Sequence, residues 1–218
     1  MDWTRAVDAY CERTGPEYWS EPVNAMTNLA FVLAAAVMWQ RAAGAPLARA
    51  LCLVLGAIGV GSYLFHTHAE VWAGMADVIP IGIFILLYLY AMNRDAWGMG
   101  GWPALAVTAL FVPYAALLVP VFERIPGLGS SAGYAPVPLL ILIYAVLLRR
   151  RLPELARGLA LGAGLLIVSL AFRTADLPLC PQWPLGTHFV WHLLNGVMLG
   201  WMIAIYLRSG LGKRQAAR

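Results

Sequence analysis

Residues 71–92 read VWAGMADVIPIGIFILLYLYAM, and this stretch decides the fold class. Its one charged side chain is Asp77, and apolar residues fill most of the rest. A transmembrane helix needs about 20 mostly apolar residues, because the hydrocarbon core of a bilayer is about 30 Å thick. The stretch therefore predicts a helix that spans a membrane.

Apolar stretches of similar length lie on both sides of residues 71–92, and each predicts another span. They are residues 22–41, 46–66, 102–122, 133–150, 153–173 and 185–207. The composition agrees, because 61% of the 218 residues are hydrophobic and only 12% are charged, whereas soluble domains are about half apolar and about a quarter charged. We expect an all-α integral membrane protein, built as a bundle of seven transmembrane helices.

The spans divide the chain into three parts. Residues 1–21 form an acidic N-terminal segment, residues 22–207 the membrane domain, and residues 208–218 a basic tail. We expect no cleavable signal peptide, because residues 1–21 are polar and acidic rather than basic and then apolar.

Basic residues are distributed unequally between the two ends of the predicted spans. Eleven of the fifteen lie on one side, namely Arg41, Arg49, Arg94, Arg149, Arg150, Arg151, Arg157, Arg208, Lys213, Arg214 and Arg218. The other four are Arg5, Arg13, Arg124 and Arg173. Cytoplasmic loops carry the excess of Lys and Arg, so we expect a cytoplasmic C-terminus and an N-terminus outside. The net charge of +4 does not indicate nucleic-acid binding, because the basic residues lie at helix ends and in the tail. The Ala, Gly and Arg content is typical of a high-GC genome and points to a bacterial inner membrane.

Ionisable side chains within the spans gather toward the outer end. His66 ends the second span, and Asp77 lies in the first two turns of the third. His188 and His192 open the seventh span one helical turn apart, so both rings project from one face. Ionisable groups inside a membrane are rare and usually functional.

These histidines predict a metal site. Three imidazoles with an open fourth position are the ligand set of a catalytic zinc, so we predict zinc bound by His66, His188 and His192. Ser62 lies one turn before His66, which places a hydroxyl nearby. The fourth histidine, His68, faces a different direction, and we expect it in a loop or in a supporting position.

Two other cofactors suit the sequence less well. Haem held by paired histidines needs opposed ligands deeper in the bundle, which two rings on one helical face do not provide. A retinal protein needs a lysine within a span, and the only lysine is Lys213 in the tail.

Several short motifs occur together along the chain. They are YCER at 10–13, SEPVN at 20–24, TN at 27–28, GSYLFH at 61–66 followed by Asp77, and PLGTHFVWH at 184–192. The combination S-x-x-x-H, then D, then H-x-x-x-H resembles the alkaline ceramidase family, within a wider group of seven-helix membrane hydrolases and receptors. The resemblance extends from one end of the chain to the other.

The resemblance implies a zinc amidase that cleaves ceramide or a similar N-acyl lipid into a fatty acid and a sphingoid base. In that reaction Asp77 would take a proton from water, and Ser62 would donate a hydrogen bond to the developing oxyanion. A serine nucleophile is the competing role for Ser62, although Asp77 is a poor activating base for it. Ser62 could also serve only as a small residue for close helix packing beside Gly59 and Gly61.

In the family, the N-terminal region carries a calcium ion. Calcium binds six to eight oxygen ligands, and the resemblance points to Glu12 and Glu21, with Asp8 and Tyr10 as further candidates. The sequence departs from the family pattern at two ligand positions. Ala9 stands where an aspartate is usual, and Thr14 stands where an asparagine is usual.

Two cysteines fall on the outer side, where disulfides persist. A bridge between Cys11 and Cys180 would tie the N-terminal segment to the loop before the seventh span, and the resemblance supports this pairing. Cys52 lies within a span. Arg173 and Asp176 fall in the same loop region, either as an ion pair or as groups that support the site.

Three functions fit these residues: a zinc hydrolase of membrane lipids, a lipid receptor with a structural metal, and a transporter. A structural zinc is usually closed by four protein ligands, and a transporter usually has broken helices around polar groups at the midplane. Neither feature is evident, so the hydrolase is favoured and the receptor is the alternative. We expect the lipid substrate to enter sideways from the membrane, with Gly158, Gly162 and Gly164 leaving room for its acyl chains.

Overall fold

The computed structural model describes residues 2–213. Within them the chain is helical, and β structure is limited to an isolated antiparallel bridge between Ala6 and Glu70. The last five residues of the expected basic tail, 214–218, which include Arg214 and Arg218, lie outside the described residues.

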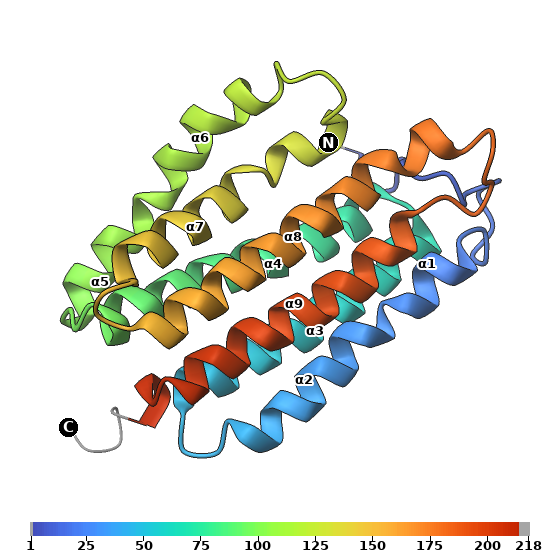
Figure 1. Cartoon of the computed structure of the whole chain (residues 1–218). Coiled ribbons are helices and arrows are strands. Elements are labelled where there is room, and N and C mark those ends of the chain that lie inside the picture. Colours follow the sequence, from blue (N-terminus) through green and yellow to red (C-terminus); the bar gives the residue numbers. More distant parts are fainter. Residues whose placement is uncertain (1, 214–218) are drawn as a thin grey trace.

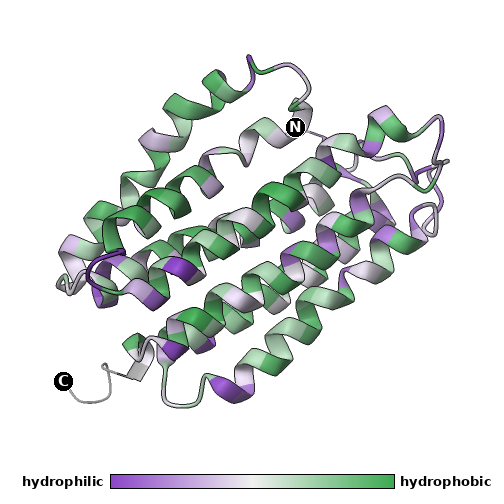
Figure 2. Cartoon of the chain, in the orientation of Figure 1, coloured by the Kyte–Doolittle hydropathy of each residue, from purple (hydrophilic) through white to green (hydrophobic). Residues whose placement is uncertain are grey.

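Seven helical spans within residues 2–213 are long and apolar enough to cross a membrane, which confirms the predicted fold class. They are Pro22–Arg41, Pro46–His68, Val71–Ala96, Gly101–Phe122, Gly129–Leu148, Pro153–Leu179 and His188–Arg208. Hydrophobic residues cover the middle of these helices, and hydrophilic residues concentrate near their ends (Figure 2). The chain is therefore a multi-pass membrane protein.

The spans are built from helices that are shown in Figure 1. Their bounds are α1 Pro22–Thr27, α2 Leu29–Arg41, α3 Pro46–His68, α4 Val71–Ala91, α5 Gly101–Ala109, α6 Phe111–Phe122, α7 Pro136–Leu148, α8 Pro153–Leu179 and α9 His188–Arg208. Helices α1, α3, α7 and α8 begin with proline, which suits the first helical position because the N–H that proline lacks would have no partner there.

The sixth span is longer than predicted. The sequence suggested an end at Arg173, but α8 continues to Leu179, so Arg173 and Asp176 lie in a helix and not in a loop. The buried Asp176 is stable there because its carboxylate accepts backbone hydrogen bonds from three residues, namely Cys11, Thr187 and His188. The third span also extends beyond its predicted end, through a π-helical turn at Met92–Ala96.

Helix α9 lies at the centre of the bundle, against α2, α3 and α8 (Figure 1). Helix α3 packs closely along α4, and α7 packs along α8. The core is formed mainly by aliphatic residues of α3, α8 and α9. Helix α6 lies at the edge of the bundle, and none of its residues is buried.

The N-terminal segment, the α3–α4 turn and the α8–α9 connection lie together at one end of the bundle (Figure 1). Backbone hydrogen bonds join Val7 to Ala69 and Val71 to Arg5, so the segment is tied to the α3–α4 turn. A disulfide between Cys11 and Cys180, with sulfur atoms 2.09 Å apart, ties it to the end of α8. This end of the bundle holds all of the predicted site residues.

Candidate metal centre and catalytic site

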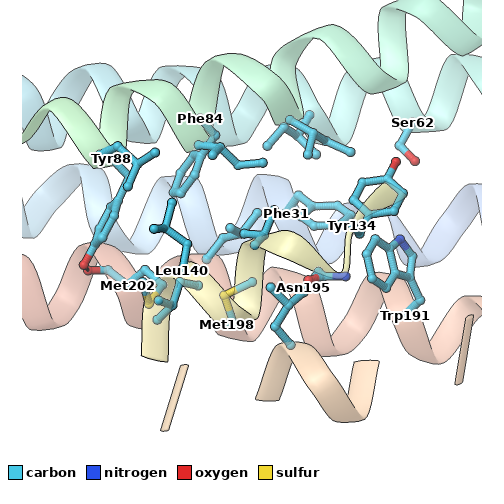
Figure 3. A pocket seen from close by; sticks show the side chains of 18 of the residues that line it. Phe31, Ser62, Phe84, Tyr88, Tyr134, Leu140, Trp191, Asn195, Met198 and Met202 are labelled. Atoms are coloured by element: carbon cyan, nitrogen blue, oxygen red, sulfur yellow. Dashed lines mark hydrogen bonds between the residues drawn. The ribbon is translucent and has the colours of Figure 1, made fainter. Parts of the chain in front are cut away.

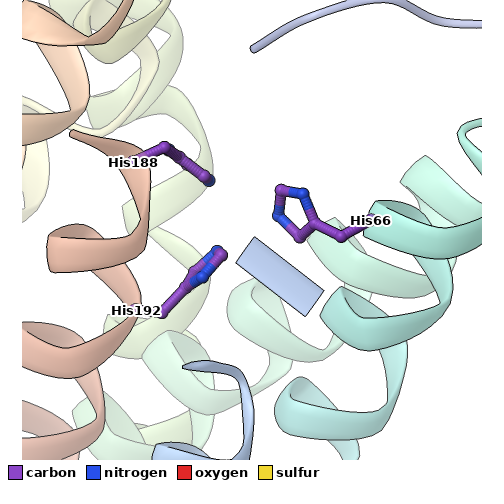
Figure 4. A group of neighbouring side chains, drawn as sticks. All are labelled: His66, His188 and His192. Carbon is purple, nitrogen blue, oxygen red and sulfur yellow. The ribbon is translucent and has the colours of Figure 1, made fainter. Parts of the chain in front are cut away.

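Three histidines from two helices converge on one point. His66 comes from the last turn of α3, and His188 and His192 from the first turns of α9 (Figure 4). Their ligand atoms all lie within 4.8 Å of one another, and each residue is only 1% exposed. The sequence spacing therefore predicted correctly which histidines the fold brings together.

The ring nitrogens at the centre of this cluster have no hydrogen-bond partner among residues 2–213. They are Nε2 of His66, Nδ1 of His188 and Nε2 of His192. Buried polar atoms in native proteins almost always have a partner, and three converging imidazole nitrogens are a ligand set of catalytic zinc. The donor atoms thus fit a metal ion of this kind.

Glu21 determines which nitrogen of His66 is free. Its Oε2 lies 2.6 Å from Nδ1 of His66, and an ionised carboxylate can only accept a hydrogen bond. Nδ1 therefore carries the proton, and the lone pair of Nε2 points into the cluster. Burial alone would raise the pKa of Glu21, but its interactions with His66 and with the Arg13 guanidinium bring the pKa below its ordinary value.

Thr27 acts on His192 in the same way. Its hydroxyl donates toward the backbone carbonyl groups of Val23 and Asn24, so its oxygen can accept from Nδ1 of His192 at 2.9 Å. This fixes the proton on Nδ1 and leaves Nε2 free to bind a metal. Partners of this kind orient metal-binding histidines in many proteins.

His188 is held by stacking and by its backbone. The Tyr10 ring lies against its imidazole with the ring centroids 3.6 Å apart, and Asp176 accepts the His188 N–H at 2.9 Å. Burial raises the pKa of Tyr10, against the opposing effect of Arg173. The Tyr10 hydroxyl is therefore uncharged, and the Tyr10 ring forms one wall of the site.

Ser62 and Asp77 lie next to each other beside the histidine cluster. The Asp77 carboxylate interacts with the Ser62 hydroxyl, with His66 and with Arg173. Gly61 explains why two helices can meet so closely here. A Cβ atom at that position would lie 2.0 Å from the backbone oxygen of Ala76, so α3 and α4 touch through their backbones.

An apolar pocket begins at this point and runs into the bundle between α4, α7 and α9 (Figure 3). Ser62, Tyr134 and Trp191 stand at one end, and Tyr88 and Met202 stand at the other. The lining also includes Phe31, Ile58, Asp77, Ile81, Phe84, Ile85, Leu89, Val137, Leu140, Ile141, Leu166, Asn195, Met198 and Leu199. Polar groups thus meet a long hydrophobic cavity at one place.

The glycines of α8 do not create this space, contrary to the expectation from the sequence. A Cβ at Gly158 would lie 2.8 Å from Ile205, and one at Gly162 would lie 2.6 Å from the Met202 sulfur. These glycines allow α8 and α9 to pack closely. Gly164, for its part, does not line the pocket.

The expected calcium ligands have other partners. The Glu12 carboxylate accepts the N–H groups of Val23 and Asn24, both at 2.7 Å, at the start of α1. Glu21 is bound to His66 and Arg13, Tyr10 stacks on His188, and Asp8 is exposed. Within residues 2–213 these acids form no cluster with metal-binding geometry, so the structure gives calcium no support. Burial raises the pKa of Glu12, and its two backbone hydrogen bonds oppose the rise.

Two further sequence expectations need correction. His68 is the last residue of α3 rather than a loop residue, and its exposed ring contacts Tyr18 and Trp72, away from the cluster. Arg173 does not pair with Asp176. Its guanidinium donates to the hydroxyls of Ser130 and Ser131.

Sequence reasoning missed the roles of Arg13 and Thr27 and assigned Glu21 to a different ion. For Asp176 it offered a supporting role as one of two alternatives, and the structure agrees with that one, since Asp176 accepts the His188 N–H. Glu21 and Thr27 both belong to the motifs quoted above, so their presence was noticed but their partners were not. Those partners are 45 and 165 residues away in the sequence, and no local spacing indicates such pairs.

Comparison with known proteins gives one finding for the whole chain. A family model described as Ceramidase matches residues 6–218. A comparison with curated proteins finds no match. The matched range includes the histidine cluster, its supporting residues and all seven helical spans.

Proposed function

Because this chain belongs to the ceramidase family, we propose that it is a zinc-dependent amide hydrolase acting on ceramide-like lipids inside the membrane. Its products are a fatty acid and a sphingoid base. One observation carries the proposal: three buried imidazole nitrogens without partners face one another beside a carboxylate, at the mouth of an apolar pocket.

His66, His188 and His192 would hold the metal. A zinc ion bound by three protein ligands supplies Lewis acidity and lowers the pKa of its water from about 15.7 to about 7. Glu21 and Thr27 keep the two Nδ1 atoms protonated, so the ligand atoms are oriented before the metal arrives.

Asp77 is the proton carrier in this proposal. It accepts a proton from the attacking water, whose oxygen forms a bond to the amide carbon. When the carbon–nitrogen bond breaks, Asp77 returns that proton to the leaving amine. A carboxylate placed within hydrogen-bonding reach of both atoms contributes about 10²–10⁴-fold to such a reaction.

Ser62 is the donor to the oxyanion. Ser62 is only 3% exposed, it interacts with the Asp77 carboxylate, and both residues line the pocket. Its hydroxyl can turn from the carboxylate to the carbonyl oxygen as negative charge develops. The same small residue also allows the close contact of α3 and α4 beside Gly61. The two roles are compatible, because packing fixes the serine where the donor is needed.

The pocket suits the acyl chain of a lipid amide. The interval from Trp191 to Met202 on α9 spans about 16 Å at the usual helical rise, and the lining along it is almost entirely apolar. A lipid whose acyl chain lies in the pocket would have its amide group at the Ser62 end of the pocket. Since the bundle spans a membrane, the lipid enters sideways between helices rather than from water.

The orientation follows from the basic residues. The site lies at the end of the bundle that holds the N-terminal segment, the α6–α7 connection and the end of α8, which carry Arg5, Arg13, Arg124 and Arg173. The connection between α7 and α8, with the arginine run at 149–151, lies at the opposite end (Figure 1). By the positive-inside rule the site faces away from the cytoplasm, as in the outer half of a bacterial inner membrane.

The test is hydrolysis by purified protein in detergent. Ceramides of several acyl lengths and other N-acyl lipids are incubated with wild type and with Asp77→Asn, and fatty acid and amine are quantified by mass spectrometry. We expect both products in equal amounts from wild type and at least about 10²-fold less from the variant. Saturable binding of these lipids by wild type without cleavage of any of them would instead indicate a receptor with a structural metal.

A further inference from the structure

Arg13 is a buried cation at the back of the histidine cluster. Its side chain is only 4% exposed, and all three guanidinium nitrogens have a partner. Nε donates to Oε1 of Glu21 at 2.5 Å, Nη1 to the Gly15 carbonyl at 2.9 Å, and Nη2 to the His66 carbonyl at 3.1 Å. Burying a charge is costly unless the charge is paired and hydrogen-bonded. Arg13 is paired with Glu21 and makes a hydrogen bond through each of its three guanidinium nitrogens.

Arg13 contacts His66 by two routes. It binds the His66 backbone carbonyl directly, at the last turn of α3, and it binds Glu21, whose other oxygen accepts from Nδ1 of the His66 ring. A planar guanidinium holds several acceptors in a fixed geometry, unlike the point charge of lysine. The position and the ring orientation of one metal ligand therefore both depend on Arg13.

The same contacts account for the missing calcium site. Calcium collects six to eight oxygens from carboxylates and carbonyl groups, and here a carboxylate and two carbonyl oxygens already surround the guanidinium. Ala9 and Thr14 stand at two of the expected ligand positions and bring no carboxylate. The residues present thus suit an internal arginine and not a calcium ion.

We propose that the Arg13 guanidinium replaces calcium in this chain, as a positioning residue that fixes His66 for metal binding and ties the N-terminal segment to the bundle. The protein then needs zinc but no calcium. The statement about turnover rests on the proposed function, whereas the statement about metal binding can be tested without any substrate.

The first test is binding of Co²⁺, a coloured substitute for zinc, to metal-free protein. Wild type, Arg13→Lys and Arg13→Ala are titrated while the visible absorption of the metal centre is recorded, with Arg5→Ala as the control. Arg5 lies in the same N-terminal segment but is exposed. We expect Arg13→Ala to weaken Co²⁺ binding about 10–100-fold, as loss of a supporting partner does, and to change the spectrum. Arg13→Lys should fall between Arg13→Ala and wild type, and Arg5→Ala should equal wild type.

Thermal unfolding of the same metal-free samples separates positioning from stability. A lower unfolding temperature for Arg13→Ala with unchanged Co²⁺ affinity and spectrum would overturn the positioning role. If Arg13→Ala does not fold, the milder Arg13→Lys decides, because it keeps the charge but cannot reach all three acceptors.

The second test removes calcium. Bound calcium and zinc are measured by mass spectrometry, and turnover is measured in calcium-depleted buffer with and without millimolar Ca²⁺. We expect no bound calcium and no response to added Ca²⁺. Bound calcium, or turnover that requires Ca²⁺, would refute the replacement. If wild type cleaves no lipid, the proposed function fails, while the Co²⁺ titration still tests the positioning role of Arg13.

Discussion

Oε2 of Glu21 lies 2.6 Å from Nδ1 of His66, although the two residues are 45 positions apart in the sequence. The contact joins the entrance of the first span to the end of the second, and it leaves the other nitrogen of His66 free for a metal. The contact therefore supports the metal site that we propose for the histidine cluster.

The first prediction concerns Glu21. Glu21→Ala removes the acceptor for His66 Nδ1 and leaves the buried Arg13 without its carboxylate, so metal affinity should fall about 10–100-fold. Glu21→Gln should lose less, because its amide oxygen still accepts from Nδ1. Competition with a colourimetric zinc chelator measures both values, and equal affinities for Glu21→Ala and wild type would show that the contact does not support the ligand.

The second prediction concerns the contact of α3 with α4. Gly61→Ala would place a methyl group 2.0 Å from the Ala76 oxygen, which forces the helices apart at Ser62 and Asp77. Overpacking of this kind costs about 1–3 kcal/mol, and we expect a lower unfolding temperature and much reduced turnover. Gly82→Ala on α4 is the control, since nothing lies within 4 Å of its new methyl group. If both variants behave alike, the close approach has no special importance.

The third prediction distinguishes the roles of Ser62. If its hydroxyl stabilises the oxyanion, Ser62→Ala should lower kcat about 10²–10³-fold with bound zinc unchanged. Mass spectrometry of the protein during turnover should show no acyl adduct, because serine is not the nucleophile in this account. An acyl–Ser62 adduct, or a kcat equal to that of wild type, would contradict the assigned role.

The fourth prediction concerns acyl length. Met198 lines the middle of the pocket and is 3% exposed, so Met198→Trp should block its deeper half. Turnover of long-chain amides should then fall much more than turnover of short-chain ones. Val197→Trp, at a neighbouring position that is 62% exposed, should keep the wild-type preference. An unchanged chain-length preference in Met198→Trp would show that the acyl chain lies elsewhere.

The fold could be predicted well from the sequence because membrane spans are a local property. Each span must supply its own apolar surface and satisfy its own backbone hydrogen bonds. Residues 71–92 therefore predict a helix without information from any other part of the chain. The predicted end of the sixth span was wrong for a related reason. Arg173 and Asp176 looked like the border of a span, but distant N–H groups satisfy Asp176 inside the helix.

The histidine cluster was also predictable, because one helical turn separates His188 from His192 and the alternation of spans brings His66 to the same end. The residues that orient these rings were not. Glu21, Thr27 and Arg13 act through contacts across the bundle, which depend on the packing of α1 and the N-terminal segment. Glu21 was therefore assigned to calcium, although its carboxylate serves His66 and Arg13.

The central claim is that a zinc ion held by the three histidines is required for amide hydrolysis. The most direct measurement is bound zinc and fatty acid release on the same preparations of wild type, His192→Ala and Asp77→Asn. We predict zinc and turnover in wild type, neither in His192→Ala, and zinc with turnover reduced at least about 10²-fold in Asp77→Asn. Hydrolysis by wild type without zinc, or undiminished hydrolysis by zinc-free His192→Ala, would contradict the account.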